Sequence, residues 1–403
     1  MNFILLLGII ILAGFIGKKL SALVKLPGVT GYLIIGVVLG QSLLNLLTPQ
    51  MLENSATITD ITLGIVGFII GDQLVFHKFR KIRKGILIMI LTESLGAFIL
   101  VTAAVYLLTR RLDIALLLGA IAPASAPAGT IAVLQEYRAK GILTNTLLAV
   151  VGLDDGLGII IYVFMAALVK VIFFSATSVS FMRVFLVPLT KILSSILIGG
   201  GAGLLLALIL QKIRNREETM VIVFGFIFLF TGIANYLNVS LILLNLTMGI
   251  VVVNLYPPLS IRLSRILDDT VPILYIIFFI FAGAHLNVWR IPEMGLIGII
   301  YVISRSAGLI GGASFGALIS NAPTVLKKYL GLGILSQAGV AIGLSLLVIR
   351  EFSIFGAAGK DLGTIIVTTI AATTIVFEIV GPITTKIAIT KAGEIRPKKP
   401  SNR

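Results

Sequence analysis

Runs of mostly apolar residues recur along the whole chain, separated by short segments that are charged or rich in Pro and Asn. A helix needs roughly 20 apolar residues to cross a bilayer, and about thirteen runs reach that length. Charged residues make up only 12% of the 403 residues, about half of the usual share in soluble domains. We therefore expect an all-α polytopic membrane protein with spans centred on Ile9, Ile35, Ile65, Phe98, Leu118, Ile159, Ile198, Phe226, Leu246, Ile277, Leu309, Gly343 and Ile375.

The net charge of +15 comes mainly from loops that follow odd-numbered spans and from the basic end of the chain. Cytoplasmic loops are enriched in Lys and Arg, so we expect the N-terminus outside and the C-terminus in the cytoplasm of a cell inner membrane. The first run has no cleavage site and is interpreted as a retained span rather than a signal peptide. The charge thus indicates orientation rather than nucleic-acid binding, and we expect the tail, 391–403, to contact anionic membrane lipid.

Two adjacent aspartates, Asp154 and Asp155, fall in the middle of the sixth run, between apolar or small residues. A charge at the bilayer centre costs at least about 2.5–3.5 kcal/mol, so residues of this kind usually have a function. Neighbouring residues of a helix point about 100° apart. We therefore expect one aspartate to bind an ion while the other pairs with a cation on another helix; the alternative is a buried pair that only holds helices together.

Three further charged residues fall inside spans. Arg305 lies in the eleventh span and stays protonated, so it is expected to have a carboxylate close by. The candidates are Asp154, Asp155 and Glu93 of the fourth span, and both a structural ion pair and a direct part in transport remain open. Glu378 lies toward the cytoplasmic half of the last span, where a helix-anchoring role is favoured.

Two spans contain residues that interrupt helices. The fifth contains Pro123, Pro127 and Gly129, which remove backbone donors and free carbonyls, and the twelfth contains Gln337 and Gly339. If spans one to six correspond to spans eight to thirteen, these breaks occupy matching positions, and the single linking span makes the halves inverted. Interrupted segments at matching positions indicate a transporter's binding site, although a simple kink explains either break alone.

These motifs resemble the monovalent cation:proton antiporter family, which includes bacterial sodium/proton antiporters and Kef-type potassium/proton antiporters with paired aspartates. The run from Ala126 to Gly141, followed by Leu153-Asp154-Asp155, carries most of the resemblance. Weaker segments at 26–33, 278–286 and 378–382 extend it over essentially the whole chain, in family order.

The resemblance implies an antiporter fold with two crossed, interrupted helices in a single transmembrane unit, 1–390. It also implies a homodimer, with a core domain at about 84–174 and 295–390 and a dimerisation domain at about 1–75 and 184–286.

The resemblance also implies roles for individual residues. Asp155 is expected to be the principal Na⁺-binding carboxylate, with Asp154 as its neighbour. Ser125 and Thr130 are expected in the interrupted helix beside them, and Gln337 near the matching break. Paired-aspartate members of the family usually have lysine where this chain has Arg305, which leaves the stoichiometry open: two aspartates suggest two protons per cation, whereas a permanent charge on the arginine suggests one.

We therefore predict a secondary active Na⁺/H⁺ antiporter in which the cation and the proton compete for Asp155. K⁺/H⁺ exchange is the alternative within the class, because oxygen ligands do not reveal cavity size. A passive cation channel, from another class, would need a ring of acids or a carbonyl filter. A membrane-embedded enzyme would need a catalytic constellation that the sequence does not offer. No GxxxxGK[ST] motif occurs, so we expect no nucleotide-binding domain, and no cofactor beyond the transported Na⁺ and H⁺, with Li⁺ or K⁺ as further candidates.

Overall fold

The computed structural model describes residues 3–23, 28–40, 42–47, 51, 56–75, 84–174, 181–213, 215–286 and 291–395. Within these ranges the regular secondary structure is helical, without strands, as the sequence predicts. Most of the basic loop at 78–84 and the tail beyond residue 395 lie outside the described residues. The orientation and the lipid contact that depend on those basic residues therefore stay predictions.

Each of the thirteen predicted span centres lies in a different helix. Seven stretches of the described chain are long and apolar enough to cross a membrane, and four shorter apolar helices accompany them. The chain is therefore a multi-pass membrane protein.

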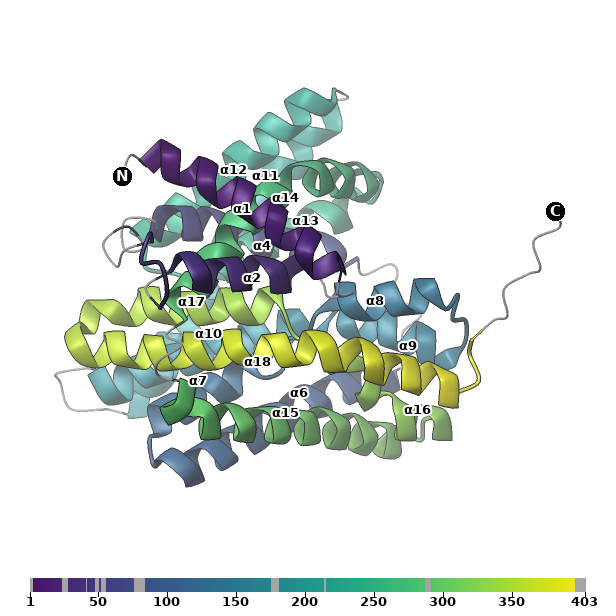
Figure 1. Ribbon diagram of the computed structural model, residues 1–403. Coiled ribbons are helices and arrows are strands. Elements are labelled where there is room, and N and C mark those ends of the chain that lie inside the picture. Colours follow the sequence, from purple (N-terminus) through teal and green to yellow (C-terminus); the bar gives the residue numbers. More distant parts are fainter. Residues whose placement is uncertain are drawn as a thin grey trace.

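The helices pack in two layers (Figure 1). One layer, here called the core layer, consists of α6 (Lys84–Thr109), α7 (Leu112–Ile121), α8 (Pro127–Glu136), α9 (Ile142–Val151), α10 (Asp154–Phe174), α15 (Ile291–Ile319), α16 (Thr324–Tyr329), α17 (Gly339–Phe352) and α18 (Gly356–Lys391). The other, here called the second layer, consists of α1 (Phe3–Leu23), α2 (Gly28–Leu39), α4 (Ala56–Gln73), α11 (Phe181–Lys212), α12 (Arg216–Tyr236), α13 (Leu241–Leu255) and α14 (Pro258–His285).

Chain segments far apart in sequence meet within each layer. In the core layer α6 lies along α15 and α17 lies against α18; in the second layer α13 packs on α4 and α11, and α14 packs on α2. Contacts of α10, α17 and α18 with α4, α11 and α14 join the two layers. That these layers act as the expected core domain and dimerisation domain stays a prediction.

Glycines allow α6 and α15 to approach backbone to backbone. A Cβ at Gly308 would lie 2.5 Å from the Cα of Ala97, and one at Gly312 would lie 2.6 Å from the Cα of Glu93. Small residues of this kind let membrane helices pack closely. Because of this contact, Glu93 on α6 and Arg305 on α15 are carried by two tightly packed neighbouring helices.

Candidate ion-binding site

The fifth predicted span is interrupted between α7 and α8. Helix α7 ends at Ile121 and α8 begins at Pro127, in the first-turn position where the missing proline N–H costs nothing. Pro123 lies in the connecting segment, 122–126, which leaves the helical path and exposes backbone carbonyls. The predicted break is confirmed, and it occurs at the prolines because these residues cannot supply the donors of a continuous helix.

The twelfth span is interrupted in the same way. After α16, a 3₁₀ turn (Gly331–Ile334) leads into a non-helical segment, and α17 begins at Gly339. The two breaks touch directly, since the N–H of Ala126 donates to the carbonyl of Ser336 over 3.0 Å. A Cβ at Gly381 of α18 would lie 2.6 Å from the Cα of Ser336. Helix α18 therefore supports the crossing from one side.

Arg305 joins the two interrupted segments. Its Nε donates to the carbonyl of Ala122 (2.8 Å) and one terminal nitrogen to that of Leu335 (2.8 Å), while the other donates to Ala124 (3.0 Å) and more weakly to Ser336 (3.5 Å). The side chain is fully buried, and the guanidinium lies 4.3 Å from the ring centre of Phe377. The arginine thus replaces the helical donors that both breaks remove.

The carboxylates expected close to Arg305 do lie near it, but without a direct ion pair. None of the ion pairs among the described residues joins the guanidinium to an acid, although Asp154, Glu93 and Asp155 all lie close enough to interact with it electrostatically. The reason is that carbonyls freed by the breaks take its N–H groups. Their dipoles stabilise the charge at short range, and the three acids act from further away.

The aspartates lie at the start of a helix rather than in the middle of one. Helix α9 ends at Val151, and α10 begins at Asp154, so both carboxyl groups belong to the first turn of α10. The N-terminal end of a helix favours negative charge because its N–H groups are unpaired and its dipole is positive there. The chain turns briefly at Gly152 and Leu153, but Ile142–Phe174 forms one apolar span with the aspartates inside it, as the sequence predicts.

The two carboxyl groups have different surroundings. One oxygen of Asp154 accepts from the N–H of Asp155 (2.7 Å), and one oxygen of Asp155 accepts from the N–H of Ser125 in the first break (3.2 Å). The Ser125 hydroxyl has no hydrogen-bond partner among the described residues. Both aspartates are buried, at 0% and 3% exposure. Asp155 is therefore in direct contact with the interrupted backbone at Ser125, and the ion-binding role expected for these residues stays a prediction.

Several buried oxygens at the crossing have no hydrogen-bond partner among the described residues. These include Glu93 Oε2, Ser125 Oγ, Asp154 Oδ2, Ser336 Oγ and Gln337 Oε1. Buried polar atoms are normally paired, so such a group of acceptors is suited to bind a cation or a proton. Gln337 is held in place because its Nε2 donates to the hydroxyl of Tyr301 over 2.8 Å.

Two expected residues lie elsewhere. The hydroxyl of Thr130 donates to the carbonyl of Gly333 (3.0 Å), so this side chain ties α8 to the second interrupted segment rather than to the aspartates. Glu378 of α18 accepts a hydrogen bond from Thr30 of α2, which joins the core layer to the second layer. That contact is consistent with a helix-anchoring role.

Sequence reasoning missed three residues around the site. Tyr301 and Phe377 hold Gln337 and Arg305, but aromatic residues in apolar spans carry no distinguishing signal. Ser336 lies in the small, polar segment of the twelfth span. Its contact with Ala126 could not be predicted from the sequence, because the crossing joins residues that are distant in the chain.

Two interrupted helices that cross around buried carboxylates define a secondary transporter. The sequence matches the family described as "Sodium/hydrogen exchanger, transmembrane" over residues 4–387. The chain belongs to this family, the monovalent cation:proton antiporters, and is therefore a transporter rather than an enzyme.

Solved structures support the same fold. The sodium proton antiporter MjNhaP1 from Methanocaldococcus jannaschii, determined at pH 8, superimposes with a TM-score of 0.79 at 20% identity, covering 96% of this chain and 98% of that one. An electron-microscopy structure of MjNhaP1 gives a TM-score of 0.72 at 18% identity, covering 99% and 100%. A search of curated protein sequences finds no match.

Proposed function

We propose that the chain exchanges Na⁺ for H⁺ across a cell inner membrane, and that the two ions compete for Asp155. The observation that carries this proposal is the contact between the Asp155 carboxyl group and the Ser125 backbone of the first break. It puts an ionisable oxygen beside non-helical chain in the interior of a membrane protein. MjNhaP1, which has the same fold, is a sodium proton antiporter.

The oxygen chemistry of the site favours a hard monovalent cation. Carboxylate, hydroxyl and amide oxygens are ligands of hard cations, and Asp155, Asp154, Ser125 and Gln337 provide all three kinds. A bare carboxylate is costly to bury, so the site is stable only with a proton or a cation bound. Binding of one ion therefore requires release of the other, which couples their movements.

Alternating access follows from the two layers. We infer that the core layer, loaded with either ion, moves against the second layer as a rigid body, as in other transporters built from inverted repeats. The second layer would form the homodimer contact. The N-terminus would lie outside and the basic tail in the cytoplasm, next to anionic lipid.

The decisive experiment measures proton movement in proteoliposomes that contain an internal pH dye. Addition of Na⁺ to the purified protein is expected to release protons, and the apparent affinity for Na⁺ is expected to fall as the pH falls, because protons compete. Asp155→Asn should abolish the exchange. Asp361→Asn, which removes a half-exposed carboxylate away from the crossing, is the matched control and should be active.

Each other outcome has a definite meaning. Exchange driven by K⁺ and not by Na⁺ would establish K⁺/H⁺ antiport, the alternative within the class. The same assay with Li⁺ tests how strongly the site discriminates between cations of different size. A cation flux that does not depend on pH and is not coupled to proton movement would refute antiport and indicate a passive channel. Undiminished exchange by Asp155→Asn would refute the site assignment. The same assay at imposed membrane potentials measures the stoichiometry.

A further inference from the structure

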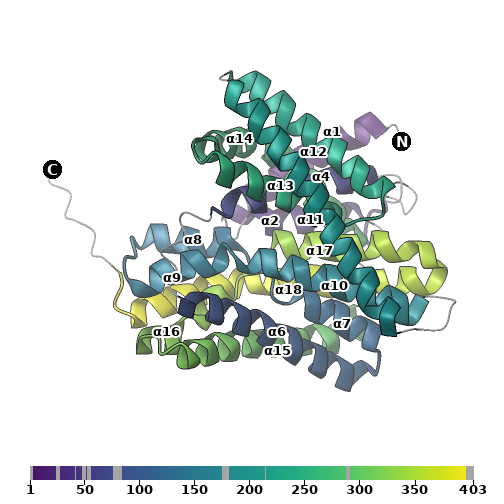
Figure 2. The ribbon, with the colours of Figure 1, turned by 180° about the vertical axis from the view of Figure 1, so that it is seen from behind.

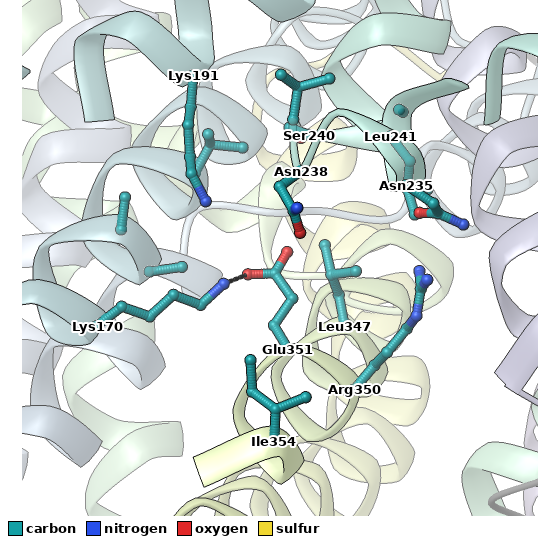
Figure 3. A pocket seen from close by; sticks show the side chains of 15 residues that line it. Lys170, Lys191, Asn235, Asn238, Ser240, Leu241, Leu347, Arg350, Glu351 and Ile354 are labelled. Atoms are coloured by element: carbon teal, nitrogen blue, oxygen red, sulfur yellow. Dashed lines mark hydrogen bonds and ion pairs between the residues drawn. The ribbon is translucent and has the colours of Figure 1, made fainter. Parts of the chain in front are cut away.

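A cavity of about 230 Å³ lies between the two layers, near the ends of α10 and α17 (Figure 3). Its walls come from α10 and α17 of the core layer and from α11, α12 and the start of α13 in the second layer. Charged and polar side chains enter it, namely Lys170, Lys191, Asn235, Asn238, Arg350 and Glu351. Neither aspartate of the ion site lines the cavity.

One ion pair beside this cavity crosses from layer to layer. Arg350, in the last turn of α17, pairs with Asp60 of α4. The Asp60 side chain is only 8% exposed, and its other oxygen accepts from the amide of Asn235 on α12 over 2.9 Å. Figure 3 shows Arg350 on the same side of the cavity as Asn235. The arginine of the core layer thus pairs with α4, and the carboxylate that it contacts is held in place by α12.

A second ion pair in the same cavity does not cross. Lys170 of α10 pairs with Glu351 of α17, the residue that follows Arg350 (Figure 3). Both residues belong to the core layer, so relative movement of the layers leaves this contact intact. Of these two ion pairs among the described residues, the Arg350–Asp60 pair, here called the interlayer pair, joins the two layers, whereas the Lys170–Glu351 pair lies within the core layer.

The interlayer pair is connected to the ion site through α17 itself. This helix starts at Gly339, directly after the second break, and Arg350 lies about 16 Å further along it. Between the two, a Cβ at Gly343 would lie 2.9 Å from Leu63 of α4, one turn after Asp60. Helix α17 thus contacts α4 along its length, with the interrupted segment at one end and the ion pair at the other.

We propose that the Arg350–Asp60 pair holds the two layers together on this face, which is the external face in the proposed orientation, and thereby sets the balance between inward-open and outward-open conformations. This inference rests on the proposed alternating-access function. In a buried ion pair, loss of one partner leaves the other charge uncompensated, which destabilises the conformation that contains the pair. The closed external face would then be less populated, while the ion site itself is unchanged.

The affinities at the two faces test the proposal. The apparent affinity of a ligand falls in proportion to the population of the conformation that binds it. In oriented proteoliposomes, Arg350→Gln and Asp60→Asn are expected to lower the KM for Na⁺ at the external face and raise it at the internal face, each by at least about threefold. The charge-reversed double variant, Asp60→Arg with Arg350→Asp, should move the ratio of the external to the internal KM part of the way back to the parent value.

Lys170→Gln, which breaks the pair within the core layer, should leave this ratio of KM values unchanged.

A second measurement does not depend on transport. The chain contains no cysteine, so a single Ala234→Cys, fully buried in the cavity wall, reports the separation of the layers. Its labelling by a membrane-impermeant maleimide should be faster in Arg350→Gln than in the parent, and unchanged in Lys170→Gln. Arg350→Lys keeps the charge and should label as slowly as the parent.

The outcomes separate this inference from the proposed function. Unchanged labelling in both Arg350→Gln and Asp60→Asn would overturn the role of the interlayer pair, even if antiport is established. Faster labelling in a protein without Na⁺-driven proton movement would retain the pair as an interlayer contact and refute the antiport proposal. Equal acceleration by Lys170→Gln would mean that the cavity loosens in general, and would also overturn the inference.

Discussion

At the scale of single residues, the crossing depends on the shape of one side chain. The guanidinium of Arg305 directs several N–H groups in a fixed plane, and four carbonyls from two separate segments accept them. An ammonium group has three donors on a single atom and cannot reach all of these acceptors. The arginine is therefore a structural requirement of the two breaks as well as a charge beside the acids.

Arg305→Lys should accordingly destabilise the protein. An orphaned buried acceptor costs about 1–3 kcal/mol, and the lysine leaves at least one carbonyl at the crossing unpaired. We expect a lower thermal unfolding temperature in detergent and reduced Na⁺-driven exchange. Arg350→Lys, a matched substitution at a half-buried position, should unfold near the parent temperature. Equal stability of Arg305→Lys and the parent would contradict the structural role.

Sequence reasoning found the charged residues but not their partners. Asp154, Asp155, Arg305 and Glu93 stand out because charges are rare in apolar spans. The acceptors of Arg305 could not be predicted, since they are backbone atoms 183 and 30 residues away and are free only because the chain leaves the helical path there. The expectation of a carboxylate partner followed from side-chain chemistry alone.

At the scale of helices, the closest contact is the one between α6 and α15. Their backbones touch at Gly308 and Gly312, so the helices carry Glu93 and Arg305 at a fixed spacing. Only small residues allow helices to approach this closely. The prolines, by contrast, are a signal from which the sequence predicted the first break. The turn before Asp154 was missed, since a single Gly152 in an apolar run does not distinguish a break from a continuous helix.

Gly312→Ala tests this contact. Its Cβ would meet the carbonyl of Thr92 and lie 2.6 Å from the Cα of Glu93, and overpacking of this kind costs about 1–3 kcal/mol. The neighbouring Gly311 has open space around it, so Gly311→Ala is the matched control and should raise helix stability by at most about 1 kcal/mol. Thermal unfolding of the two variants compares them directly, and equal unfolding temperatures would exclude a tight α6–α15 contact.

At the scale of the whole molecule, the two layers have different parts in the proposed mechanism. The core layer moves in the proposed mechanism. Helices α1 and α12 lie on the side of the second layer away from the core layer (Figures 1 and 2), and they carry exposed apolar side chains such as Phe15 and Leu229. The apolar pattern predicted the helices but not this division, because every span needs an apolar surface whether it meets lipid or protein.

The proposed homodimer can be tested in the naturally cysteine-free chain. Single cysteines at Phe15 of α1 and Leu229 of α12, which are 53% and 58% exposed, scan the second layer. Oxidation should give disulfide-linked dimers from at least one of them. Ile303→Cys on α15, at 64% exposure, is the control on the core layer and should stay monomeric. Cross-linking only at residue 303 would contradict a dimer formed by the second layer.

The burial of Arg305 also has an electrical consequence. Its charge is permanent and is carried by the same layer as Asp154, Asp155 and Glu93, so a displacement of that layer along the membrane normal carries the charge through part of the transmembrane voltage. Movement of one elementary charge across the whole voltage is worth about 2.3 kcal/mol per 100 mV. The number of these three acids that carry a proton or a cation therefore determines the net charge of the moving layer. That net charge decides how strongly the membrane potential drives or opposes each half of the transport cycle.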